Sequence, residues 1–364
     1  MLTPNHPTSP ILFAYTPNDD LNTEGGFDVY RVIGSAINWT AGTNNNIEWY
    51  LYADGYAPET VAYTALHRTA LEQTRSMVSS IRSKVAGDRL CGSCGSSKTK
   101  IQHYAWVNPV YYNTKSKNPV DVDGDIWGFE AGIDVFRNDY HRIGGFVSYR
   151  QGEYDLNGKG RVIYSNIGSS IDTKSYIGGL YYQYDNDKQW LFATLYGGTQ
   201  RSDIKTNDGV RSNTEGSQFG FSIDGGYSFD AGNGWVLEPG VGAAYTQINF
   251  DDASDNYGKT ASYDTLSQFL MSASVKIQKN ICLDSGEAHF YFKPGILKTF
   301  THGDTVSISG INNVKTYGDS LLGQVEVGAK YAITNSLSTY GYANYTFGDH
   351  YKLTSLGIGL SWSF

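Results

Sequence analysis

The chain ends in Ser355-Leu-Gly-Ile-Gly-Leu-Ser-Trp-Ser-Phe364, and this stretch decides the fold. Its large apolar residues alternate with serine and glycine, so a strand formed here has one apolar face and one small, polar face. In a water-soluble protein, a strand of this kind at the edge of a sheet would promote aggregation. In an outer-membrane barrel it is the closing strand, with the apolar face toward lipid and the polar face toward the lumen. The rest of the chain distinguishes these two interpretations.

The composition favours membrane strands over membrane helices. Aromatic residues make up 14% of the chain, but the mean hydropathy is -0.38 and no run of about 18 apolar residues occurs. Alternating strands have a low average hydropathy even when they cross a membrane. The net charge of -8 argues against a nucleic-acid partner. Residues 1–20 contain no charged segment followed by an apolar core, so we expect any export signal to lie upstream.

Alternating segments of about ten residues fill the C-terminal part of the sequence. There are twelve of them: Ile101 to Asn113, Asp125 to Arg137, His141 to Tyr154, Ser175 to Tyr184, Gln189 to Arg201, Glu215 to Phe229, Trp235 to Phe250, Ser267 to Lys279, Ala288 to Thr299, Leu321 to Ile333, Leu337 to Phe347 and Thr354 to Phe364. An even number is what a closed antiparallel single-chain barrel requires.

The links between these segments alternate in length. Short turns follow the second, fourth, sixth and tenth segments, and long polar stretches such as Gly152 to Lys174 and Thr301 to Ser320 follow the third, fifth, seventh and ninth. The link after the eighth, Asn280 to Glu287, is intermediate. Short periplasmic turns and long outer loops are typical of outer-membrane barrels. The sequence therefore predicts an all-β transmembrane fold, a 12-stranded antiparallel outer-membrane β-barrel.

Charged residues are confined to one face of most predicted strands. We assign that face to the lumen, and five carboxylates lie on it: Glu130, Asp134, Asp224, Glu238 and Glu326. The fifth and eleventh strands, at Trp190 to Thr199 and Ser338 to Phe347, do not reveal which face points inward.

A long helix is predicted before the barrel. Residues 58–86 begin with Pro and Glu, contain no interior proline or glycine, and end at Gly87. At 1.5 Å per residue such a helix is about 43 Å long, enough to thread a membrane. Arg68, Arg75 and Arg82 recur every seven residues and form a stripe, which on an isolated helix would be a solvated face. Since a twelve-stranded barrel has room for about one helix, we expect this helix in the lumen with its arginines toward the carboxylates.

Several short motifs resemble those of a known family. Gly26-Phe-Asp-Val-Tyr-Arg-Val32 followed by Glu48-Trp-Tyr-Leu51 is similar to the last β-helix rungs of autotransporter passengers. Asn233-Gly-Trp-Val-Leu-Glu-Pro239 resembles the family's G-W-x-L-E-P-Q strand opening, although Gly240 replaces the glutamine. Ile143-Gly-Gly-Phe-Val-Ser-Tyr149 resembles its G-x-x-G-G-Y strand, and the C-terminus resembles its closing strand, with Ser361 in place of the usual charge. Because these motifs occur in this order and follow such a helix, the chain as a whole resembles the translocator end of a type Va autotransporter of Gram-negative bacteria.

The resemblance implies a secretion device with three parts. Residues 1–57 would be the end of a β-rich passenger, 58–90 a linker helix in the lumen, and 101–364 the translocator barrel. It implies that the partners are outer-membrane lipid, the barrel assembly machinery, periplasmic chaperones and the chain's own upstream passenger, and that the barrel is a monomer with the passenger end at the cell surface. In this family the assembly machinery reads the aromatic end of the closing strand, here Leu360, Trp362 and Phe364.

The sequence contains little that supports an enzyme active site or a cofactor site. No Gly-x-Ser-x-Gly elbow occurs, and the seven histidines do not cluster at ligand spacing. Cys91 and Cys94 form a single CxxC, for which a local disulfide or two inert thiols are better explanations than zinc. Some autotransporters cleave their own helix at an asparagine, which residues 58–86 do not contain. We expect no enzyme activity, no metal and no cofactor. The alternative functions are a diffusion porin or adhesin-type barrel with a periplasmic N-terminal part, and a soluble all-β binding protein.

Overall fold

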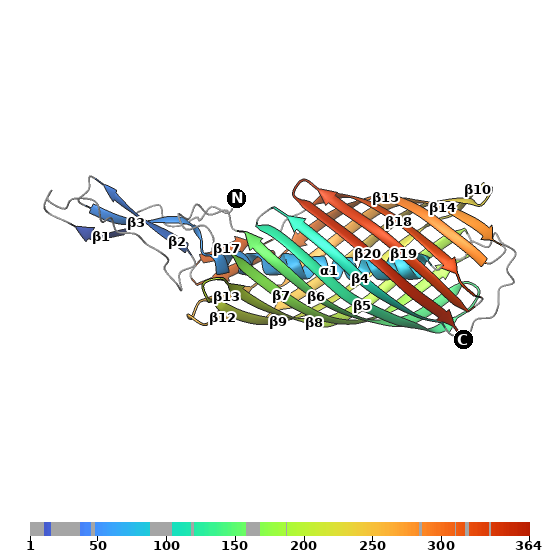
Figure 1. Cartoon of the computed structure of the whole chain (residues 1–364), viewed down its shortest axis with the longest axis horizontal. Helices are drawn as coiled ribbons and strands as arrows, with labels where there is room; N and C mark the ends of the chain where they lie inside the picture. The colour runs from blue at the N-terminus through green and yellow to red at the C-terminus, as the bar shows by residue number, and fades with distance from the viewer. Residues whose placement is uncertain are drawn as a thin grey trace.

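The computed structural model describes residues 11–15, 37–44, 48–87, 104–117, 120–157, 168–186, 188–283, 286–309, 311–316, 320–334 and 336–364. Within them, twelve long antiparallel strands form the wall of a closed barrel around one helix (Figure 1). The predicted fold class is confirmed. The wall consists of β4 (Tyr104–Ser116), β5 (Asp121–Arg137), β6 (His141–Asn157), β7 (Ser169–Asp185), β8 (Gln189–Thr206), β9 (Arg211–Tyr227), β11 (Trp235–Phe250), β14 (Leu266–Leu283), β15 (Gly286–His302), β18 (Leu321–Ala332), β19 (Leu337–Gly348) and β20 (Tyr351–Ser363).

The barrel closes between the first and the last wall strands. β20 pairs with β4 in an antiparallel ladder that runs from Tyr351 opposite Ser116 to Ser363 opposite Tyr104. Five short strands extend hairpins at the two ends of the wall: β10 (Phe229–Gly232), β12 (Ala253–Asp255), β13 (Thr260–Tyr263), β16 (Thr305–Ile308) and β17 (Ile311–Lys315). Closure leaves no free edge, which the backbone of a membrane-spanning sheet requires.

The strands are longer than the ten residues expected from the sequence. β8 and β14 each reach 18 residues, whereas about 9 to 11 suffice to cross a membrane. The extra residues carry charge on the outer surface, for example Asp123, Glu153 and Arg201, so this part of the wall projects beyond the lipid. The link after the eighth strand is also shorter than predicted, because β14 runs to Leu283 and pairs there with Gly286 of β15.

The outer face of the wall is apolar where it crosses the membrane. Along β5, Trp127 and Phe129 are 50% and 45% exposed on the outside, whereas Glu130 between its apolar neighbours is fully buried inside. The two strands of undecided phase also alternate: β8 turns Phe192 inward and Leu195 outward, and β19 turns Tyr345 outward. Their phase was not evident from the sequence because large aromatic residues, such as Phe192 of β8 and Tyr342 of β19, lie on the inner face.

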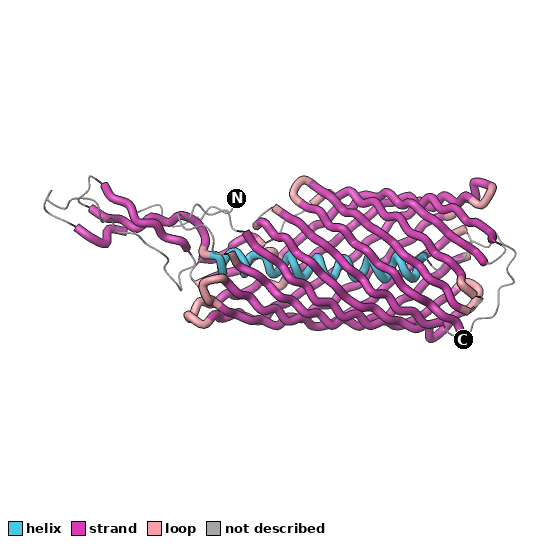
Figure 2. The backbone as a smooth tube through the Cα atoms, viewed as in Figure 1, coloured by secondary structure: helices cyan, strands magenta, loops and turns pink. Residues whose placement is uncertain are grey.

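One helix, α1 (Pro58–Gly87), runs along the inside of the barrel (Figure 2). Glu59 in its first turn and Lys84 in its last turn complement the helix dipole. Among the described residues, no helix is both long and apolar enough to cross a membrane. We call the end of the barrel where α1 begins the outer end, and the end where α1 finishes the inner end.

A separate three-stranded antiparallel sheet lies beyond the outer end of the barrel (Figure 1). It has the order β1-β3-β2 and consists of β1 (Ile11–Tyr15), β2 (Ile37–Asn44) and β3 (Glu48–Tyr56). Of the two motifs that resemble passenger rungs, the one at 48–51 lies in β3, and the one at 26–32 lies outside the described residues.

Candidate functional site

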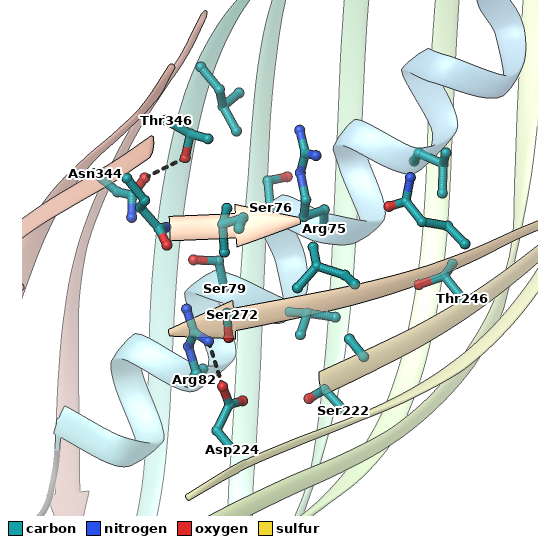
Figure 3. Close-up of a pocket in the computed structure, with 18 of the residues that line it drawn as sticks. Arg75, Ser76, Ser79, Arg82, Ser222, Asp224, Thr246, Ser272, Asn344 and Thr346 are labelled. Carbon is teal, nitrogen blue, oxygen red and sulfur yellow. Dashed lines mark hydrogen bonds and ion pairs between the residues drawn. The ribbon is translucent and has the colours of Figure 1, made fainter. Parts of the chain in front are cut away.

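The inner half of α1 is bound to the wall by charged and polar contacts. Arg82 donates a hydrogen bond from Nη1 to Oδ1 of Asp224 on β9 at 2.8 Å (Figure 3). One residue further on, the hydroxyl of Ser83 donates to Oε2 of Glu326 on β18 at 3.0 Å. Both carboxylates are almost completely buried, so these contacts form away from bulk water. A charge-assisted hydrogen bond is strong in such surroundings.

A fully buried ion pair holds the middle of the helix. Glu130 of β5 and Arg150 of β6 form this pair, and neither side chain is exposed to solvent. Ser80 Oγ donates to Glu130 Oε2 at 2.7 Å, and Arg150 Nη1 donates to Ser76 Oγ at 2.7 Å. Asn108 Nδ2 donates to the same Glu130 oxygen at 2.9 Å. These extra hydrogen bonds are what a buried pair needs to offset the cost of removing two charges from water.

The outer half of α1 is enclosed mainly by apolar side chains. Val61, Leu66 and Leu71 belong to a buried cluster that includes residues of the hairpins β12–β13 and β16–β17, such as Ala261 and Ile308. Polar contacts also cross this region, and two of them involve Glu59 and His67. Glu59 forms a fully buried ion pair with Lys259, and His67 Nδ1 lies 2.8 Å from Thr316 Oγ1.

The three arginines of the helix have different partners. Arg82 contacts one of the carboxylates assigned to the lumen, Asp224. Arg68 pairs instead with Glu72 one helical turn further on, at 3.2 Å. Arg75 donates to the hydroxyl of Tyr351, and its guanidinium lies 4.8 Å from the centre of that ring. The arginine stripe of α1 therefore contacts a wall carboxylate at its inner end and an aromatic ring further out.

The five carboxylates assigned to the lumen all lie on the inner face, and each is at most 7% exposed. Glu130, Asp224 and Glu326 contact α1 directly. The other two carboxylates pair with basic residues of the wall. Asp134 accepts a hydrogen bond from Arg142 at 2.6 Å, and Glu238 lies 2.6 Å from Lys276 Nζ. The pairing of the lumen carboxylates with basic residues of the wall was not predicted, although Arg142, Arg150 and Lys276 have the same inward phase as the carboxylates.

The residues of the closing strand lie on the lipid side. Leu360, Trp362 and Phe364 are 44%, 39% and 64% exposed, at the inner end of β20. They point away from the lumen and do not contribute to binding α1.

A small cavity lined by polar and apolar side chains lies beside the helix (Figure 3). Its volume is about 60 Å³, and at roughly 10 to 15 Å³ per water centre it has room for a few waters. Arg75, Ser79 and Arg82 line it from the helix, and Ser222 and Ser272 from the wall. The helix leaves space for water on this side, but none for a second folded segment.

The described residues offer no arrangement for chemistry on a metal. Within them, no group of three or more His, Cys, Asp or Glu side chains could hold a metal ion. Cys91 and Cys94, and therefore the expected local bridge between them, lie outside the described residues. Cys282, at the inner end of β14, is disulfide-bonded, a role that the sequence analysis did not predict for it.

Comparisons with known proteins agree with this geometry. The family model "Autotransporter beta-domain" matches residues 105–344. The Adhesin BmaC autotransporter of Brucella suis is 25% identical over 269 residues, which are 68% of this chain and 8% of the relative. The Pertactin autotransporter of Bordetella parapertussis is 26% identical over 243 residues, 62% of this chain and 24% of the relative. The chain thus spans less than a quarter of the length of these two relatives.

Solved structures share the fold at low sequence identity. The translocator domain of autotransporter NalP from Neisseria meningitidis has a TM-score of 0.61 at 13% identity, covering 80% of this chain and 98% of that one. The transport unit of AIDA-I from Escherichia coli also has a TM-score of 0.61 at 13% identity, covering 79% and 98%. Because the family model matches well over half of the 364 residues, the chain belongs to the autotransporter β-domain family, and its barrel is an outer-membrane translocator.

Proposed function

We propose that the barrel delivers an upstream passenger to the cell surface and that α1 then stays in the lumen as a plug. In this proposal residues 1–57 are the end of the passenger, residues 58–90 the linker helix and residues 101–364 the translocator. The observation that carries the proposal is the set of buried polar contacts between α1 and three wall strands, through Arg82, Ser80 and Ser83. A diffusion porin needs an open aqueous lumen, whereas in the described part of this chain α1 occupies the lumen and the cavities beside it are small.

We further propose that the barrel acts as a monomer, without enzyme activity, metal or cofactor. Its other partners would be the barrel assembly machinery and periplasmic chaperones. The assembly machinery would read Leu360, Trp362 and Phe364, whose outward orientation supports recognition before the strand is buried in lipid.

Surface proteolysis tests the delivery proposal against the porin alternative. An epitope tag fused before Met1 should be removed by protease added to intact cells, because the N-terminal part lies outside. A matched tag inserted between Gly232 and Gly234, in the turn after β10, should survive, because this turn faces the periplasm. Protection of the N-terminal tag together with loss of the turn tag would show that the barrel has the opposite orientation, and it would support the porin alternative.

A further inference from the structure

The line where the barrel closes has a gap in its ladder of paired residues. We call this line, between β4 and β20, the seam. The ladder there steps from Gly357 opposite Val110 directly to Leu360 opposite Val107. Proline has no N–H to donate, and Pro109 occupies the gap between these pairs. On its other side Pro109 remains opposite Phe129 of β5, so the break is confined to the seam.

The seam differs from a second proline gap in the wall. Between β14 and β15 the ladder steps from Ser274 opposite Gly295 to Ile277 opposite Phe292, at Pro294. Those two strands are joined by a short hairpin turn, so the chain itself keeps them together. The strands of the seam are the first and the last of the barrel, and their pairing must close a loop of more than two hundred residues. Such a long-range pairing has a larger entropic cost and forms late.

The inner surface of β20 offers little packing of its own at the gap. Gly357 and Gly359 face the lumen there, and Tyr342 and Tyr340 of β19 cover them. A Cβ atom on Gly359 would lie 2.4 Å from the carbonyl oxygen of Val107 and 2.5 Å from the Tyr340 hydroxyl. Glycine is therefore required at this position, and at the gap the closing strand has no side chain that could contact the helix.

Two residues of α1 bridge the seam from inside. Ser80 Oγ accepts a hydrogen bond from Asn108 of β4 at 2.9 Å and another from Tyr342 of β19 at 2.8 Å. One turn further on, Lys84 Nζ donates to the Tyr104 hydroxyl of β4 at 3.1 Å and lies 4.3 Å from the centre of the Tyr340 ring of β19. Both residues thus bind the wall on either side of β20. A serine hydroxyl that donates to Glu130 and accepts twice uses its full hydrogen-bonding capacity.

From these contacts we infer that α1 is a staple for the seam: Ser80 and Lys84 hold β4 and β19 together across β20, where the wall lacks hydrogen bonds. The barrel wall is weak along this line while the lumen contains no helix, and it becomes stable when the helix arrives. The inference adds to the proposed plug a second role for the same helix, and it rests on α1 occupying the lumen.

Hydrogen exchange of the full chain, refolded in detergent, tests the staple. Ser80→Ala combined with Lys84→Met should speed exchange of the amides of residues 106–110 and 356–360 by roughly tenfold, the size expected for losing buried hydrogen bonds. Exchange in β7 and β8, which lie close to α1 but away from the seam, should stay unchanged. The control is Thr74→Val combined with Ser83→Ala, which removes two helix hydroxyls that bind a single wall strand each, Gln218 of β9 and Glu326 of β18.

A rescue variant separates the staple from general loss of stability. Adding Pro109→Val to Ser80→Ala/Lys84→Met restores an N–H at the gap and should slow exchange at the seam again. Pro294→Val, which fills the other gap, should not. Faster exchange spread evenly over the wall, or equal effects of the stapling and control pairs, would overturn the inference. If the helix still blocks the pore in those variants, the plug function stands without the staple.

Discussion

The two halves of α1 both bury apolar side chains, the inner half through Met77, Ile81 and Val85, but they differ in how strongly polar contacts bind them to the wall. The outer half, up to Leu71, is buried among apolar side chains of the wall and of the hairpins β12–β13 and β16–β17. The inner half, from Gln73 onward, forms hydrogen bonds and ion pairs with the wall through residues such as Ser80 and Arg82. Apolar burial is strong but non-directional, whereas hydrogen bonds require a defined rotation and depth. The difference indicates that the outer half seals the lumen and the inner half sets the register of the helix.

The largest effect should come from breaking the central ion pair in the inner half. Arg150→Met leaves Glu130 buried without its cation, and we expect this to cost about 3 to 5 kcal/mol of unfolding free energy. Denaturant unfolding of the refolded barrel measures this cost. Arg150→Met combined with Glu130→Gln removes both charges and should recover most of the loss. Equal stability of the single and double variants would show that the pair is not what holds this region.

A cavity in the outer half should cost somewhat less and act differently. Leu66 is fully buried in the apolar cluster, and Leu66→Ala should lower the unfolding free energy by about 2 to 4 kcal/mol. Because apolar packing is non-directional, the depth of the helix should not change. Cross-linking between Ser80→Cys and Asn108→Cys, measured with and without Leu66→Ala, checks this, and a change in cross-linking yield would contradict the division of roles.

The smallest effect is expected for an ion pair outside the lumen. Lys115 and Asp123 lie 2.7 Å apart on the outer surface, but their side chains are 59% and 48% exposed. Lys115→Ala should therefore change the unfolding free energy by only about 0 to 1 kcal/mol. A loss as large as that of Arg150→Met would mean that burial does not decide the strength of the charge pairs in this barrel.

The alternating pattern of the wall could be predicted because its cause is local. Lipid selects apolar residues at every second position, so strands such as Trp127 to Val135 reveal their outer face without knowledge of their neighbours. The helix was equally clear, since Pro58, the uninterrupted interior and Gly87 are local signals. The closing strand was visible for the same reason, with Leu360, Trp362 and Phe364 at alternate positions.

The contacts inside the lumen depend on residues far apart in the sequence, and there prediction reached only part of the site. The heptad spacing of the arginines places them on one stripe, but it does not say what each one meets along the barrel axis. Arg82 lies beside Asp224, while Arg75 lies over Tyr351. The sequence also could not show that Arg142 and Lys276 of the wall would form ion pairs with Asp134 and Glu238. The seam contacts of Ser80 likewise join residues 28 and 262 positions away.

The central claim is that α1 plugs the barrel through polar contacts at its inner half. Single-channel conductance in planar bilayers tests it most directly. The full chain should form a narrow pore of low conductance, deletion of residues 58–86 should produce a wide pore, and Arg82→Glu, which would face Asp224, should produce part of that increase. Conductance that is the same for all three proteins would contradict the claim, because a helix that can be removed without opening the pore does not fill it.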